Sequence, residues 1–91
     1  MPVAVHICPD HMSKQDYERV IAELKASSAD QPEGRRFHAA YGDENNLRLF
    51  EVWDSQEQFE AHRGDLFVTL QGVGLGGGDV TIHPLHSELP D

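Results

Sequence analysis

The feature that most constrains the fold of this chain is the way its hydrophobic period changes from one segment to the next. Short runs rich in β-branched and aromatic residues, typical of strands, alternate with longer runs in which apolar residues recur every three or four positions. Strands are expected at residues 3–8, 36–41, 47–53 and 80–83. A helix is expected after the first strand and another after the third. The order βαββαβ predicts an α+β, ferredoxin-like domain with a four-stranded antiparallel sheet and two helices on one face.

Both expected helices begin with a capping signal and continue as one apolar stripe. Ser13 is followed three positions later by Asp16, and Ser55 by Gln58, which is the spacing of a capping box. The spacing typical of one helix face is present in Tyr17, Val20, Ile21 and Leu24 and, in the second helix, in Phe59, His62, Leu66, Phe67 and Leu70.

The first strand indicates that the sheet has two apolar faces. Val3, Val5 and Ile7 alternate with Ala4 and Cys8, so both sides of the strand carry apolar or weakly polar groups. Two helices cover one face only, and a chain of 91 residues makes a small core by itself. We therefore expect a single domain over residues 1–91, with a polar tail at 84–91, that forms a homodimer in which the sheets face each other.

The charge balance argues against two classes of partner. Sixteen acidic residues stand against seven Lys and Arg, for a formal net charge of −9. Such a surface repels phosphate backbones and anionic lipids, so we expect neither a nucleic acid nor a membrane as partner. The N-terminal residues lack the basic segment and long apolar run of a signal peptide, and the expected location is the cytoplasm.

The histidines and the single cysteine do not form a recognisable metal-binding pattern. Cys8 alone can make neither an intramolecular disulfide nor a thiolate cluster. The potential ligands His6, Cys8, His11, His83 and His86 have a spacing that matches no established zinc site. No metal is expected.

A glycine-rich segment, residues 72–77, has the letters of the dinucleotide fingerprint G-x-G-x-x-G. That fingerprint needs a strand before it and a helix after it, so that the helix N-terminus faces the pyrophosphate. Here a helix precedes it and a strand follows. We interpret residues 71–78 as a loop, which leaves open a role in gating a pocket.

The segment from Val52 to His62, with the sequence VWDSQEQFEAH, resembles the strand-to-helix signature of the antibiotic biosynthesis monooxygenase family. Members of that family are dimeric α/β barrels of about this length, and the likeness in element order extends over residues 2–86. The resemblance implies a pocket between the sheet and the helices. It also implies oxygenase chemistry on aromatic or quinol substrates, or haem degradation in one branch of the family.

The resemblance implies roles for two histidines and argues against haem as a cofactor. His62 corresponds to the helix position that carries a pocket histidine or tryptophan in many relatives, and His6 corresponds, to within a residue, to a polar pocket residue on the first strand. The haem-degrading branch has a second helix histidine as iron ligand, where this chain has Leu70, Gln71 and Gly72. We therefore expect no haem and no other cofactor.

His62 is the main candidate for a catalytic residue. It lies on the apolar stripe of the second helix, where a neutral imidazole can take a proton from a phenol or quinol. The alternative is a core histidine that is satisfied by one backbone hydrogen bond.

Other candidates would shape the pocket. Trp53 is either a flat wall for an aromatic substrate or an anchor for the strand–helix corner. His38 alternates with Phe37, so it faces the partner subunit or solvent if Phe37 faces the core. The candidate substrate-binding residues are Trp53, His6, His38, Phe50, Phe59 and Phe67.

The favoured hypothesis is a cofactor-independent monooxygenase-like protein that acts on a small electron-rich aromatic or quinol substrate. In it, His62 removes a proton and the resulting anion reacts directly with dioxygen. The alternatives are a module that binds a small molecule without turnover, and a dimer whose histidines are purely structural.

Overall fold

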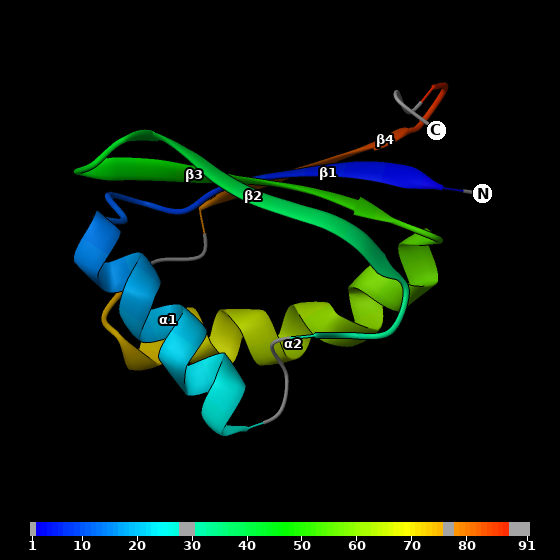
Figure 1. The fold of residues 1–91 in the computed structure, drawn as a ribbon. Coiled ribbons are helices and arrows are strands. Elements are labelled where there is room, and N and C mark those ends of the chain that lie inside the picture. The colour runs from blue at the N-terminus through cyan, green and yellow to red at the C-terminus, as the bar shows by residue number, and fades with distance from the viewer. Residues whose placement is uncertain (1, 28–30, 76–77, 88–91) are drawn as a thin grey trace.

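The computed structural model describes residues 2–27, 31–75 and 78–87. Its elements, in chain order, are β1 (Val3–Cys8), α1 (Lys14–Ala26), β2 (Arg35–Asp43), β3 (Asn46–Trp53), α2 (Gln56–Gly72) and β4 (Asp79–Pro84). The predicted βαββαβ order is confirmed. Figure 1 shows the sheet as one layer and both helices together beneath one of its faces, with the N-terminal end of β1 beside the C-terminal end of β4.

The sheet is antiparallel, with the strand order β2-β3-β1-β4. β1 and β3 are therefore its central strands, which matches the strongly apolar composition of β1. Glu51 of β3 lies opposite Val5 of β1 and opposite His38 of β2, so a carboxylate occupies the middle of the sheet. A register irregularity lies between Arg35 and Phe37, at the start of β2.

Both predicted N-cap residues cap their helices, but the predicted capping box is complete only in α1; in α2 the Gln58 side chain accepts from the Ser55 hydroxyl and not from its amide. The Ser13 hydroxyl accepts a hydrogen bond from the Asp16 amide, and the Asp16 carboxylate accepts one from the Ser13 amide, which completes the capping box. The Ser55 hydroxyl accepts one from the Gln58 amide at the start of α2. These caps set where each helix begins, and the apolar stripe then sets which side of it meets the sheet.

The core lies between the sheet and the two helices. The side chains that fill it are buried and mostly apolar, and they include Val5, Ile7, Val20, Leu24, Leu49, Trp53, Phe59, Leu66 and Leu70. Two ionisable residues, Glu51 and His62, are buried among them. Polar groups in so small a core mark the place where the functional site is to be sought.

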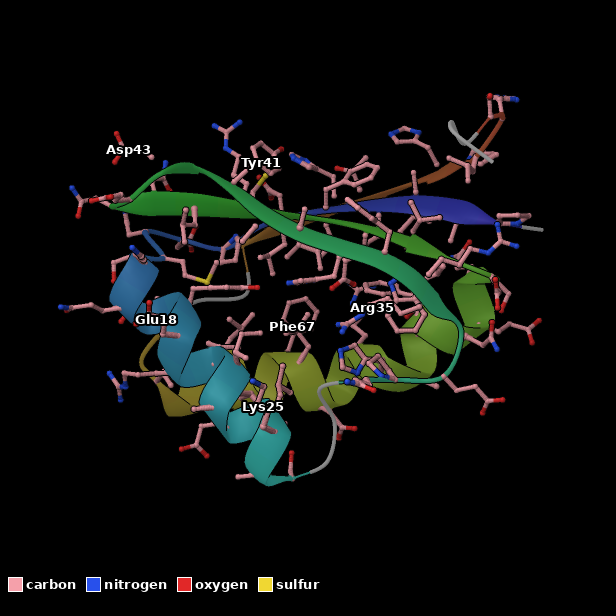
Figure 2. All side chains as sticks on the ribbon, viewed as in Figure 1. Glu18, Lys25, Arg35, Tyr41, Asp43 and Phe67 are labelled. Carbon is pink, nitrogen blue, oxygen red and sulfur yellow. The ribbon has the colours of Figure 1, made fainter. Side chains whose placement is uncertain are left out.

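The other face of the sheet carries no helix (Figure 1). Phe37 and Tyr41 of β2 are 49% and 43% exposed there, and the Phe37 ring meets the Phe50 ring edge to face at a centroid distance of 6.2 Å. Tyr41 also lies on this side in Figure 2. We call the sheet surface that carries Phe37, Tyr41, Phe50 and His6 the outer face.

Several boundaries differ from the sequence-based expectation. β2 begins at Arg35 and ends at Asp43 because pairing with Trp53 and Asn46 extends it at both ends. α2 continues to Gly72, so the loop begins later than expected. Pro84, predicted to open the polar tail, belongs to β4 and pairs with Val3.

The loop before β4 needs glycine at one described position. Gly78 has a φ of +65°, and a Cβ built on it would lie 1.9 Å from the Cys8 carbonyl oxygen. Only a residue without a side chain fits so close to β1. Residues 76 and 77 of the predicted glycine-rich loop, and 88–91 of the predicted tail, lie outside the described residues. In the described part of the chain, no helix is long and apolar enough to span a membrane.

Candidate active site

The central feature of the candidate site is the side chain of Glu51, which points from β3 toward the helices and is 1% exposed. Its Oε1 accepts a hydrogen bond from the indole nitrogen of Trp53 at 2.9 Å. Its Oε2 lies 2.7 Å from Nδ1 of His38 and 3.6 Å from a guanidinium nitrogen of Arg35. Figure 2 shows Arg35 reaching from β2 into the space between sheet and helices. Both carboxylate oxygens thus have partners.

The network continues from β2 to α1. Nε2 of His38 lies 2.7 Å from the hydroxyl oxygen of Tyr17, and the two rings are stacked at an interplanar angle of 8°. Tyr17 stands on the apolar stripe of α1 and is partly buried. One hydrogen-bonded chain therefore links Tyr17, His38, Glu51 and Trp53, and it joins α1, β2 and β3.

Glu51 is ionised at neutral pH. Burial by itself would raise the pKa of Glu51, but the hydrogen bonds from His38 and Trp53, aided by the positive charge of Arg35, lower it below the ordinary 4.5. An ionised carboxylate only accepts hydrogen bonds, so Nδ1 of His38 must be the donor toward Glu51. In the neutral ring, Nε2 is then an acceptor for the Tyr17 hydroxyl.

His62 lies on the α2 side of Trp53, with ring centroids 5.5 Å apart, and is 5% exposed. Burial lowers the pKa of His62 below 6.5, while the negative charge of Glu51 opposes that shift. Among the described residues, none forms a hydrogen bond with the imidazole. His62 is therefore a neutral base at pH 7 with ring nitrogens free to meet a ligand, and Glu51 would stabilise the imidazolium formed when it takes a proton.

A surface hollow of about 350 Å³ borders His62, and we call it the His62 hollow. It lies between α2 and the segment that leads into β2, and its described lining is Ser27, Pro32, Glu33, Gln58, Ala61, His62 and Asp65. The volume lies in the range of small-molecule sites. Of the residues proposed from the sequence to bind substrate, Phe50, Phe59 and Phe67 do not line this hollow, whose described lining is mostly polar.

The predicted site residues divide between the two faces of the sheet. His62, Trp53, Phe59 and His38 lie together on the helix side, where the Trp53 and Phe59 rings meet edge to face at 5.6 Å. Phe67 rises from α2 toward the sheet on the same side, as Figure 2 shows.

His6 and Phe50 lie on the outer face, so the structure does not bring them to His62. His6 lies opposite Phe50 in the pairing of β1 with β3. Its ring nitrogens meet the Tyr41 hydroxyl and the sulfur of Cys8, the latter at 3.5 Å. Alternation along a strand separates these two residues from the core.

His38 has the orientation that the sequence argument did not favour. Phe37 faces outward, and His38 therefore faces the helices and Glu51.

Sequence reasoning did not single out Tyr17, Arg35 or Glu51 as site residues. The available signal was the alternation of Leu47, Leu49 and Trp53, which places Glu51 on the buried side of β3.

Within residues 2–27, 31–75 and 78–87, no group of three or more His, Cys, Asp or Glu side chains is arranged to hold a metal ion. His11 is exposed in the turn after β1, with a φ of +54°. The chemistry that this arrangement offers is proton transfer by His62, His38 and Tyr17.

Comparison with known proteins places this geometry in a family. The model of the antibiotic biosynthesis monooxygenase family matches residues 3–65, which include β1 to β3 and the first half of α2. The chain belongs to this family. No curated protein sequence gave a match.

Solved structures share the fold at low sequence identity. A variant of SnoaB, a cofactor-independent oxygenase from Streptomyces nogalater, is 17% identical with a TM-score of 0.67, and the match covers 99% of this chain and 97% of SnoaB. Rv0793 from Mycobacterium tuberculosis is 23% identical with a TM-score of 0.64, covering 98% and 99%. A conserved protein from Methanosarcina mazei is 14% identical with a TM-score of 0.59, covering 91% of each chain. At these identities the likeness confirms the fold and leaves the substrate open.

Trp53 is the only tryptophan of the chain, so its fluorescence reports on His62 directly. A protonated imidazole quenches a nearby indole. We expect the emission to fall as the pH is lowered, with a midpoint below 6.5, because burial lowers the pKa of His62. In His62→Ala the step should disappear. A step that persists in this variant would contradict the placement of His62 against Trp53, and a midpoint above 6.5 would contradict the lowered pKa of His62.

Proposed function

We propose that this protein is a cofactor-independent monooxygenase that acts on a small electron-rich aromatic or quinol substrate. The observation that carries the proposal is the neutral, buried imidazole of His62 at the edge of a hollow large enough for an aromatic ring. Membership of the antibiotic biosynthesis monooxygenase family supports this reaction class. SnoaB, a cofactor-independent oxygenase with the same fold, supports chemistry without a bound cofactor.

The reaction balances without an external reductant when the substrate is a phenol. A phenol with a free para position and one molecule of dioxygen give a quinone and one molecule of water. One oxygen atom enters the ring, and the substrate supplies all four electrons. His62 removes the hydroxyl proton, which raises the electron density on the para carbon, and that carbon then forms a bond to dioxygen.

Apolar residues behind His62 exclude water, and polar residues of the hollow hold the ring. Trp53 lies against the His62 ring in the core, and Phe59 and Phe67 lie on the same side of the sheet. Gln58, Glu33 and Asp65 line the His62 hollow and offer hydrogen-bond acceptors to the hydroxyl groups of a substrate. This lining favours a neutral, hydroxylated aromatic over an anionic one.

The test uses 1,5-dihydroxynaphthalene, which one dioxygen converts to 5-hydroxy-1,4-naphthoquinone and water. Oxygen uptake and quinone absorbance should rise together in the presence of the protein and stay at the protein-free rate with heat-denatured protein. Under anaerobic conditions no quinone should form. 1-Naphthol and naphthohydroquinone serve as second probes, and the absence of any catalysed oxygen uptake with all three would contradict the proposal.

We further propose that the outer face is covered by a second copy of the chain. Exposed aromatic side chains on an uncovered sheet are typical of an interface, and Phe37 and Tyr41 are exposed here, with Phe50 packed against Phe37. The dimer interface would then contain His6, Phe50 and Cys8.

The expected location stays the cytoplasm, where a single free cysteine remains reduced.

Light scattering should report about twice the chain mass of 10.2 kDa at micromolar concentration. Phe37→Asp should shift the protein to the monomer, because it buries a charge in the proposed interface. Val68→Asp is the matched control, since Val68 is 70% exposed on α2, away from the outer face, and should leave the dimer intact. A wild-type monomer would disprove the association.

A further inference from the structure

The buried carboxylate of Glu51 requires an explanation that the proposed role of His62 does not supply. Glu51 lies at a core-facing position of a central strand, between Leu49 and Trp53, where an apolar residue would be expected. Replacing a buried ionic group by a well-packed apolar one is often neutral or stabilising. An apolar residue could fill this position without a network of charged partners, so a chemical role is the better explanation for a carboxylate here.

The partners of Glu51 define what that role is. Its carboxylate holds Nδ1–H of His38, which leaves Nε2 of His38 to accept the proton of the Tyr17 hydroxyl. Hydroxyl, imidazole and carboxylate thus follow one another with contacts of 2.7 Å. This is the order of groups in hydroxyl–imidazole–carboxylate triads, where the carboxylate orients the ring and stabilises its charged form.

We propose that Tyr17, His38 and Glu51 form a second acid–base unit of the site, in which the Tyr17 hydroxyl is the group that gives and receives the proton. Burial raises the pKa of Tyr17, and the charge of Glu51 adds to this rise while Arg35 opposes it. The phenol is therefore protonated at neutral pH and serves as an acid. Tyr17 itself is partly exposed, and its hydroxyl contacts Nε2 of His38.

The inference rests on the proposed function, whose last step needs such an acid. Once the para carbon has bound dioxygen, the O–O bond breaks as the ring C–H bond is lost, and the departing oxygen must take two protons to leave as water. One of them is the proton that His62 removed from the substrate. The Tyr17 hydroxyl donates the other proton, and the proton released from the ring carbon returns to the Tyr17 oxygen, since both ring nitrogens of His38 already have partners. No electrons beyond those of the substrate are required.

Ionisable groups on β2 and α2 lie near this unit. Arg35 of β2 approaches Glu51, and His62 of α2 lies against Trp53, with the charge of Asp65 acting on His62. Each of these influences the proton affinity of the unit, so a test must change one member at a time and leave the others in place.

The first arm of the test needs no substrate. The chain has two tyrosines, so Tyr41→Phe leaves Tyr17 as the only source of phenolate absorbance. Tyr17 should ionise above its ordinary value of 10.0, and adding Glu51→Gln should lower the midpoint because a nearby negative charge is removed. Glu57→Gln, an exposed carboxylate on α2, is the matched control and should leave the midpoint unchanged. If Glu51→Gln leaves the midpoint of the Tyr17 titration unchanged, the proposal that Glu51 acts on Tyr17 through His38 is wrong.

The second arm follows turnover of 1,5-dihydroxynaphthalene. Tyr17→Phe should lower kcat by about 10²–10⁴-fold and release part of the consumed oxygen as hydrogen peroxide, because the O–O bond is no longer broken. Tyr41→Phe removes the matching hydroxyl on the outer face, which contacts His6, and should leave kcat unchanged. If Tyr17→Phe fails to fold, His38→Gln provides the same test with Tyr17 in place.

The two proposals fail in different ways. If the unmodified protein consumes no oxygen, the proposed function is wrong, and the phenolate titration still decides whether the unit exists. If the unmodified protein is active and a folded Tyr17→Phe matches Tyr41→Phe in kcat and peroxide release, the acid–base unit is wrong while the oxygenase activity stands.

Discussion

His62→Ala is expected to lower kcat by about 10²–10⁴-fold while the protein remains folded, which is the usual range for the loss of a general base. The imidazole is neutral at pH 7 because burial lowers the pKa of His62, so it is ready to accept a proton. The measurement pairs the initial rate of oxygen uptake with the thermal midpoint of the same sample. His83→Ala is the control, since His83 is exposed on the edge strand β4.

The competing reading is that His62 only fills the core. In that case the alanine variant loses stability by about 1–3 kcal/mol and keeps its activity per folded molecule. A destabilised but fully active His62→Ala would therefore end the catalytic assignment. His62→Asn, which restores a polar group of smaller volume, should recover part of the stability and none of the rate.

The fold could be predicted because its signals are local. The capping residues Ser13 and Ser55 and the change of hydrophobic period each lie within a few neighbouring positions. The ends of the strands could not be placed as well, because pairing partners decide them. Arg35 joins β2 only through Trp53, which lies 18 positions further along the chain.

The site was predicted in part, for a reason visible in β2 and β3. His62, Trp53 and Phe59 come from one continuous segment, and its spacing brings them together. The register irregularity between Arg35 and Phe37 places Arg35 on the same side of the sheet as His38, and no spacing rule reveals it. The hydrogen-bond partners of Glu51 come from β2 and β3, and the hydrogen-bonded network continues to Tyr17 on α1. Only the tertiary structure therefore shows that this buried carboxylate has partners for both oxygens.

Glu51→Gln is expected to destabilise the protein by about 3–5 kcal/mol at pH 7, because it removes one partner of a buried charge network. A glutamine side chain offers a single oxygen, whereas Trp53 and His38 each need an acceptor. Urea unfolding followed by Trp53 fluorescence gives the free energy of unfolding. Glu57→Gln, on the exposed first turn of α2, should change it by less than about 0.5 kcal/mol.

The pH dependence of that difference identifies the charge as its cause. The folded-state pKa of Glu51 is lowered below 4.5, so its ionised form contributes stability that is fully present above pH 4.5 and lost as the pH falls through the folded-state pKa. Below that pKa the carboxyl is neutral, as glutamine is. The gap in unfolding free energy between the parent and Glu51→Gln should therefore be largest near neutral pH and close in acid. A gap that stays constant down to pH 3 would show that shape, and not charge, explains the loss, and the buried carboxylate would then have no electrostatic role beside His62.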